Sequence, residues 1–164
     1  METEKALTHF NTAGRAQMVD VSHKDVTTRI ARASGDIQMQ PETLKRIQQQ
    51  SLYKGDVLGV ADVAAIMGAK KTPELIPMCH PLMLSGVDVA FSDLEQKTGI
   101  HVAVSVKCNG NTGVEMEALT AVATALLTIY DMCKAVDRAM VLSNIRLDEK
   151  SGGKSGVWRR DNHA

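Results

Sequence analysis

An α+β fold is predicted by three features of the sequence. An uncharged run from residue 118 to 130, rich in alanine, leucine and threonine, has the composition of a buried helix. Two segments, 87–91 and 100–106, alternate apolar with polar or small residues, as strands with one buried face do. The predicted elements follow one another as β, helices, β, β, helix, β. We therefore expect a ferredoxin-like sandwich, in which helices pack on an antiparallel sheet, with an additional helical segment.

A single domain is predicted at residues 18–157. The segment 1–17 holds few apolar side chains and is expected to be flexible. A first strand is predicted at 28–39, with an interruption at Gly35. Pro41 and Glu42 have the residue types of a first helical turn, so a helix is predicted from Pro41 to about residue 50.

Two further helices are expected next. Lys54-Gly55-Asp56 is predicted to form a turn ending in an N-cap, and a helix is predicted at 57–69, where several alanines allow close packing. Thr72-Pro73-Glu74 has the residue types that begin a helix. A third, short helix is therefore predicted to start there.

The second half of the chain is predicted to contain a hairpin, the long helix and a last strand. The hairpin turns near residues 97–99. Thr112 and Glu115 have the spacing of a capping box at the start of the long helix. The last strand is predicted at 140–147, and residues 158–164 are expected to form a C-terminal tail.

Length, charge and cysteine content limit the functions. A chain of 164 residues can bury one core without disulfides or metals. Its 19 basic and 19 acidic residues balance and aromatic residues make up 3%, which argues against binding to nucleic acids. The three cysteines form no CxxC pair, which disfavours zinc and indicates reduced thiols. The polar N-terminus and the short uncharged helix core predict no signal peptide and no membrane span, so a cytoplasmic protein is expected.

Asp131 and Lys134 stand out because they follow the uncharged run directly. Residues three apart share a helix face, so the two side chains can pair. One interpretation is an ion pair at the helix C-terminus, where the helix dipole favours the lysine. The other is an acid/base couple in an active site. Burial would raise the pKa of Asp131 and Lys134 would lower it, so the direction of the shift depends on the tertiary structure.

His80 lies between two prolines, in the run Pro77-Met78-Cys79-His80-Pro81. A lone histidine is more often structural, but each proline stiffens the backbone before it and so favours a functional role. Cys79 is not interpreted as a nucleophile activated by His80, because adjacent residues of an extended chain point to opposite faces. Lys54, at a glycine turn, is by default a solvated loop lysine.

The segment KSGGKSG, residues 150–156, has the glycines and lysines to bind an anion through backbone amides and ammonium groups. It does not fit a P-loop, because that pattern requires a glycine where Asp148 stands and too few residues follow for a helix. A mobile lid over phosphates and an unstructured tail are both compatible with this segment.

Four segments stand in order along the chain: PMCHPLMLS at 77–85, TGVEMEALTA at 112–121, LTIYDMCKAV at 127–136 and KSGGKSG at 150–156. With these segments the chain resembles the cyclic pyranopterin monophosphate synthases of molybdenum-cofactor biosynthesis. The resemblance extends from residue 18 to 156 and weakens at 92–98. Asn111 departs from the family pattern, in which a lysine is common, so the resemblance supports no phosphate contact from this position.

The resemblance implies a lyase of the phosphorus–oxygen type, with a ferredoxin-like fold. It implies conversion of 3′,8-cyclo-7,8-dihydroguanosine 5′-triphosphate to cyclic pyranopterin monophosphate, with release of diphosphate. The positions that match the family's substrate-binding residues are Met78, Cys79, His80, Met116 and Glu117. Asp131 matches the catalytic acid, while Lys134 and Lys54 match lysines of the same site. Candidates to hold the diphosphate are Lys54, Lys71, Lys150 and Lys154.

The resemblance also implies a homohexamer built from three dimers. It implies no cofactor, although Mg²⁺ could accompany the triphosphate. If Glu117 and Asp131 lie on one continuous helix, they are about 21 Å apart along its axis, which is too far for both to grip one small reacting ring system. We therefore expect Glu117 of one subunit to meet Asp131 of its neighbour.

Two other classes of function compete with this interpretation. A non-catalytic nucleotide-binding regulatory domain shares the ferredoxin-like fold but has no need of an acid and a lysine beside a buried helix. A structural, oligomer-forming domain would explain the small-residue helices and the nine methionines. It predicts that the substitution Asp131→Asn changes nothing measurable, whereas the enzyme interpretation predicts loss of turnover.

Overall fold

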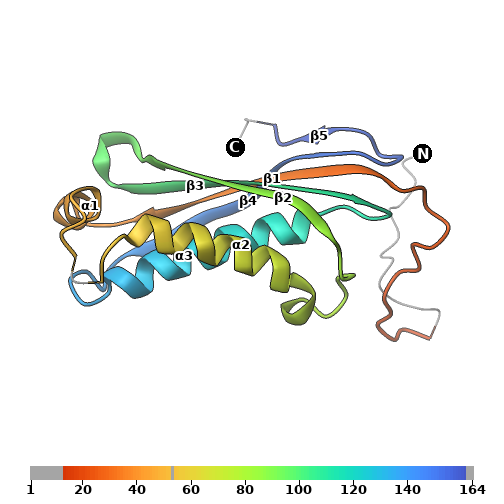
Figure 1. The fold of residues 1–164 in the computed structure, drawn as a ribbon, viewed down its shortest axis with the longest axis horizontal. Helices are drawn as coiled ribbons and strands as arrows, with labels where there is room; N and C mark the ends of the chain where they lie inside the picture. The colour runs from red at the N-terminus through yellow and green to blue at the C-terminus, as the bar shows by residue number, and fades with distance from the viewer. Residues whose placement is uncertain (1–12, 53, 162–164) are drawn as a thin grey trace.

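The computed structural model describes residues 13–52 and 54–161, which form an antiparallel sheet with helices on one of its faces (Figure 1). The strands are β1 (Thr27–Gln38), β2 (Leu84–Asp93), β3 (Gly99–Gly110), β4 (Val141–Ser151) and β5 (Trp158–Arg159). The helices are α1 (Pro41–Gln48), α2 (Val57–Leu75), the short 3-10 helix η1 (Glu95–Lys97) and α3 (Glu115–Cys133). The sheet order is β2-β3-β1-β4-β5 with antiparallel neighbours. Its first four strands have the arrangement of a ferredoxin-like sandwich, so the predicted α+β fold is confirmed.

β1 is the central strand, and the predicted interruption at Gly35 is wrong. The strand continues through Gly35, although its register with β4 shifts between Ser34 and Asp36. A Cβ atom at Gly35 would lie 2.8 Å from Val122 and 2.9 Å from Leu126, both of α3. Glycine is therefore needed because α3 packs closely against the strand there, rather than because the strand ends.

The predicted third helix is also wrong, because α2 is a single helix that contains Pro73. Proline has no N–H to donate and is unfavourable inside helices, but Pro73 lies in the last turn, so little of the helix follows it. Thr72, just before it, donates its hydroxyl to the Gly68 carbonyl at 3.2 Å and is fully buried.

The first helix, α1, ends two residues earlier than expected, and Gln50 after it has a positive φ of 50°.

The start of α3 differs from the predicted capping box. Val114 is the N-cap residue and no side chain caps the helix. Glu115 instead lies 4.0 Å from Lys150, so the side chain that would complete a capping box faces the tail segment. The hairpin β2–β3 and its turn agree with the prediction, whereas β4 extends to Ser151 and β5 was not predicted.

α3 provides the centre of the core. Its buried residues include Ala121, Ala125, Leu126 and Ile129, all with no exposed surface. α2 packs alongside it, with Gly68 so close to Thr124 that an added Cβ would lie 2.9 Å from the threonine Cβ. By length and composition α3 could cross a membrane, but half of its apolar window is buried within the protein, which identifies it as a core helix.

Of the segment predicted to be flexible, residues 1–12 lie outside the described residues and residues 13–17 are exposed. The chain then runs past one end of the sheet before it enters β1 (Figure 1). This end of the sheet also receives the end of β3, the start of α3 and the end of β4.

Candidate active site

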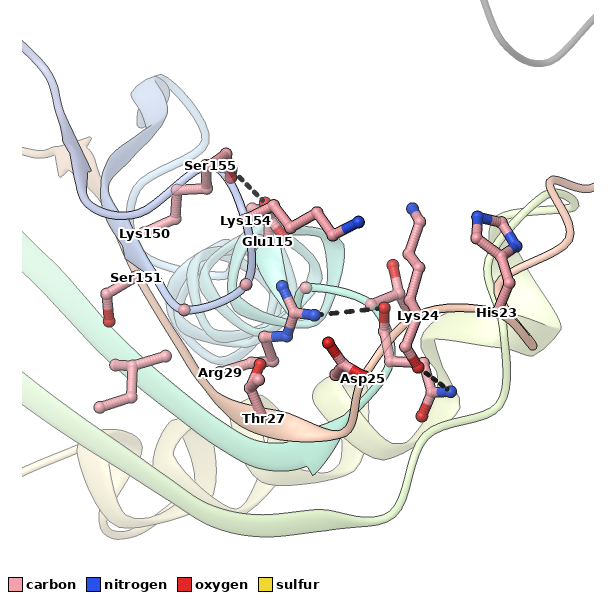
Figure 2. A pocket seen from close by; sticks show the side chains of 16 residues that line it. His23, Lys24, Asp25, Thr27, Arg29, Glu115, Lys150, Ser151, Lys154 and Ser155 are labelled. Carbon is pink, nitrogen blue, oxygen red and sulfur yellow. Dashed lines mark hydrogen bonds and ion pairs between the residues drawn. The ribbon is translucent and has the colours of Figure 1, made fainter.

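A cavity of about 640 Å³ opens at this end of the sheet. Four segments line it: the approach to β1, the first residues of β1, the connection from β3 to α3, and the turn that follows β4. Figure 2 shows the side chains that these segments contribute. Segments that are distant in the sequence therefore meet around one space.

The cavity has an excess of positive charge. Lys24, Arg29, Lys150 and Lys154 line it, against the carboxylates of Asp25 and Glu115. Arg29 is held in place because its Nε and Nη2 donate to the carbonyl oxygens of Gly110 at 3.2 Å and Asn111 at 3.3 Å. Such a set of cations suits a ligand that carries phosphate groups.

The turn after β4 is ordered by pairing and by glycines. β5 returns antiparallel to β4, with Lys150 opposite Trp158. Gly152 and Gly153 have positive φ values of 101° and 70°, and a Cβ on Gly153 would overlap the Arg29 guanidinium. Lys150 donates to the Ser155 hydroxyl at 2.6 Å, which closes the turn. The segment is thus an ordered turn that packs over Arg29 and requires glycine at the point of contact, rather than an unstructured tail.

Asp131, Lys134 and Lys54 form a second cluster at the other end of α3. Lys134 donates to Asp131 Oδ1 at 2.5 Å, and Lys54 Nζ contacts Asp131 Oδ2 at 3.4 Å and its backbone carbonyl oxygen at 2.9 Å. Hydrogen bonds from Lys134 and Lys54 lower the pKa of Asp131, and the bond to Asp131 raises the pKa of Lys134. The Asp131 side chain is 59% exposed, so the helix end is open to a ligand or to another chain.

The tertiary structure thus sets the direction of the pKa shift of Asp131, which is downward. Contact with two ammonium groups outweighs the small effect of burial, and the carboxylate is the favoured form at neutral pH. The predicted pairing of Asp131 with Lys134 is observed, and Lys54 from the α1–α2 connection joins it.

Cys79 lies close enough to Glu117, in the first turn of α3, to be affected by its charge, and His80 follows Cys79 in the chain. Glu117 is 3% exposed, and burial, helped by the negative charge of Glu115, raises its pKa. Burial and the nearby Glu117 carboxylate raise the pKa of the Cys79 thiol, which keeps it protonated and unreactive. His80 Nε2 lies 2.9 Å from the Val19 carbonyl oxygen. Because a carbonyl oxygen can only accept, Nε2 is the nitrogen that carries the proton in this bond.

The predicted site residues therefore fall into two groups on one chain. Met78, Cys79 and His80 precede β2, and Met116 and Glu117 are in the first turn of α3. Asp131 is in its last turn. Since α3 is one unbroken helix, the carboxylates of the two groups are about 21 Å apart along its axis.

Lys71 is not near the cavity described above. Its Nζ lies 3.5 Å from Glu74 on the exposed surface of α2. Lys54 also lies away from the cavity lining, beside Asp131. Of the four lysines proposed to hold diphosphate, Lys150 and Lys154 are the two that line the cavity.

Sequence reasoning missed Lys24 and Arg29. For Arg29 a signal was present, because it has the same strand phase as Ala31 and Ala33, which face the core. A cation in that phase needs a partner or a ligand. Lys24 had no such signal, because it lies in an irregular segment before β1.

The described residues contain no group of three or more histidine, cysteine, aspartate or glutamate side chains that could hold a metal ion. Cationic side chains instead dominate the cavity, and ammonium and guanidinium groups neutralise phosphate charge directly.

Residues 18–153 match the MoaC family. The cyclic pyranopterin monophosphate synthase of Thermoanaerobacter sp. (strain X514) is 59% identical over 155 residues, which are 94% of this chain and 98% of that protein. The enzyme of the same name from Desulfitobacterium hafniense is 58% identical over 157 residues, 96% of each chain. That from Rhodospirillum rubrum is 56% identical over 156 residues, 95% of this chain and 94% of that protein. The chain therefore belongs to the MoaC family, and it is a soluble enzyme, a cyclic pyranopterin monophosphate synthase of molybdenum cofactor biosynthesis.

Proposed function

We propose that the protein converts 3′,8-cyclo-7,8-dihydroguanosine 5′-triphosphate to cyclic pyranopterin monophosphate and diphosphate. The observation that carries this proposal is the cavity in which four cations surround a space beside the first turn of α3. The cations suit the triphosphate, and the neighbouring Glu117, Cys79 and His80 offer polar groups for the ring system. Met78 and Met116 supply the adjoining apolar side chains in this proposal.

The acid/base work is assigned to Asp131 and Lys134, with Lys54 beside them. Asp131 is ionised at neutral pH and can accept a proton, while Lys134 can donate one. Opening the five-membered ring and closing the new pyrazine ring both move protons between nitrogen and oxygen. A carboxylate and an ammonium in contact can therefore serve these steps in alternation, each typically worth about 10²–10⁴-fold in rate.

The phosphate chemistry is assigned to the cationic cavity. A sugar hydroxyl attacks the α-phosphorus, so that a new P–O bond forms and the bond to the β-phosphate oxygen breaks. The hydroxyl proton passes to a base, and diphosphate leaves with added negative charge. Lys24, Arg29, Lys150 and Lys154 stabilise that charge. No redox or group-carrying cofactor enters the balance of this reaction, and Mg²⁺ could accompany the triphosphate as part of the substrate.

Two chains are proposed to build each site. The cavity and Glu117 lie at one end of α3 and the Asp131 cluster at the other, so a substrate bound in the cavity does not reach Asp131 of the same chain. A two-fold axis would place Glu117 of one protomer beside Asp131 of its partner, and would do so twice in each dimer. The assembly that the resemblance implies is a homohexamer of three such dimers.

The outer face of the helices supports association. Val60, Val63 and Met67 of α2 and Leu127 of α3 are exposed large apolar side chains. Three of them line a shallow groove on α2. Exposed apolar surface of this kind is typical of protein–protein contacts.

The cysteines of the described residues are free, which fits the proposed cytoplasmic location.

Incubation with the cyclic GTP-derived triphosphate tests the proposed reaction. We expect stoichiometric release of diphosphate and formation of cyclic pyranopterin monophosphate, with both lost in Asp131→Asn. Lys71→Ala serves as the matched control, because Lys71 is an exposed lysine paired with Glu74 and away from the cavity. Binding of the triphosphate without turnover would instead favour a nucleotide-binding regulatory domain.

A further inference from the structure

A short segment of chain, residues 19–24, crosses one side of the active site. We name it the strap. At its start the Val19 carbonyl oxygen contacts His80 Nε2 at 2.9 Å. At its end His23 and Lys24 line the cationic cavity. The strap therefore joins the group around Glu117 to the proposed phosphate site.

The strap has little apolar burial to hold it. Val19 and Val21 are half-buried, and the other four residues are exposed. Internally, the Ser22 amide donates to Asp20 Oδ1 at 2.9 Å and the Lys24 amide donates to the Val21 carbonyl oxygen at 3.0 Å. These two bonds shape the turn but do not attach it to the domain. Polar contacts with the rest of the protein must therefore fix its position.

Asn111 provides two of those contacts. Its side-chain Nδ2 donates to the Lys24 carbonyl oxygen at 2.9 Å and to the Val21 carbonyl oxygen at 3.3 Å. One amide thus bridges both ends of the turn from Val21 to Lys24. A carboxylate of the same shape cannot replace it, because both partners are carbonyl oxygens that can only accept.

The backbone of Asn111 contacts the opposite wall of the cavity. Its carbonyl oxygen accepts a hydrogen bond from Arg29 Nη2 at 3.3 Å. A single residue after β3 therefore touches the strap with its side chain and a β1 cation with its backbone. Lys24 and Arg29, which come from different segments, are held at one cavity through Asn111.

We infer that Asn111 is a positioning residue that fixes the strap, so that Lys24 and His23 form a wall of the cavity before any ligand arrives. The inference rests on the proposed function for the claim that this cavity takes phosphate groups. A wall already in place spares the ligand the entropy cost of ordering it, and this raises affinity. Asn111 acts through the strap and is not itself assigned to contact substrate.

Hydrogen exchange of the ligand-free protein tests the strap directly. In Asn111→Ala and Asn111→Asp we expect the amides of residues 20–24 to exchange about tenfold faster than in the unsubstituted protein. Peptides from β3 and α3 should be unchanged, which shows that the fold is intact. The control is Asn109→Ala, two residues earlier and in β3, which removes a hydrogen bond donated by Thr28 of β1 and has no hydrogen bond to the strap. Unchanged exchange in Asn111→Ala, or slow exchange retained in Asn111→Asp, would overturn the inference.

Binding of inorganic diphosphate and steady-state kinetics test the consequence. Both Asn111 variants should bind diphosphate about tenfold more weakly and raise KM by a similar factor, with kcat within about twofold. An equal loss in kcat would show that Asn111 acts in the chemical steps and is not a positioning residue. Failure of the unsubstituted protein to bind diphosphate would refute the proposed phosphate site, whereas the exchange result would still decide whether Asn111 holds the strap.

Discussion

Mixing two inactive variants measures whether each active site draws on two chains. Glu117→Ala removes the buried carboxylate at the first turn of α3, and Asp131→Asn removes the exposed one at its last turn. Each variant alone should lose turnover: Asp131→Asn removes an acid/base group, usually worth about 10²–10⁴-fold in rate, and Glu117→Ala removes a carboxylate assigned to substrate binding. The separation of about 21 Å along an unbroken helix predicts that, in a mixed dimer, both substitutions fall in one shared site and leave the other site intact.

The recovered activity can be calculated from this arrangement. Random pairing of equal amounts makes half of the dimers mixed. Each mixed dimer then has one site with both substitutions and one site with neither. About one quarter of all sites are therefore intact, so the mixture should reach about one quarter of the unsubstituted activity. The assay is diphosphate release after co-refolding, with two different affinity tags to measure subunit exchange.

A second mixture is the matched control. Asp131→Asn and Lys134→Ala alter the same end of α3, where the two side chains are hydrogen-bonded. In a mixed dimer every site then lacks either the Asp131 carboxylate or the Lys134 ammonium group, so no recovery of activity is expected. Proven subunit exchange with no recovery in the first mixture, or recovery in the control mixture, would refute the shared site.

Three further outcomes are expected. Asp131→Asn and Lys134→Ala should each lower kcat by about 10²–10⁴-fold while the melting temperature changes little, because this ion pair is exposed. Glu117→Gln should raise the melting temperature at pH 7 but not near pH 4, since burial raises the Glu117 pKa and its charged form opposes folding above the unfolded-state pKa. Lys154→Ala should weaken diphosphate binding more in low salt than in high salt, as isothermal titration would show.

Each of these outcomes has a contradicting result. Near-normal turnover in Asp131→Asn or Lys134→Ala would remove the acid/base assignment. A Glu117→Gln variant less stable than the unsubstituted protein at pH 7 would mean that the carboxylate is stabilised by a partner rather than opposed by burial. A salt-independent effect of Lys154→Ala would indicate lost packing of the glycine-rich turn instead of a lost phosphate contact.

The elements of the fold were largely predictable because their signals are local. The alternation at 100–106 and the uncharged run at 118–130 correspond to β3 and α3. The errors occurred where tertiary packing overrides local preference. Gly35 lies inside a strand, and it is a glycine because α3 packs too closely there for a Cβ atom. Pro73 is tolerated inside α2 because so little of the helix follows it.

The candidate site was predictable where residues lie close in sequence. The pairing of Asp131 with Lys134 follows from helix periodicity alone. The family resemblance also follows from the sequence, because four segments in order carry it. The addition of Lys54 to that pair required the folded chain, since 77 residues separate it from Asp131.

Only the tertiary structure decided which cations share a cavity and what state the carboxylates adopt. Lys24 and Arg29 meet Lys150 and Lys154 because β1 and β4 are antiparallel neighbours, and strand pairing cannot be read from a local pattern. The pKa of Asp131 falls and that of Glu117 rises because the first has two ammonium groups beside it and the second is buried. A sequence lists the ionisable groups, but the free energy of ionising each one depends on its neighbours and its exposure to solvent, which only the folded chain defines.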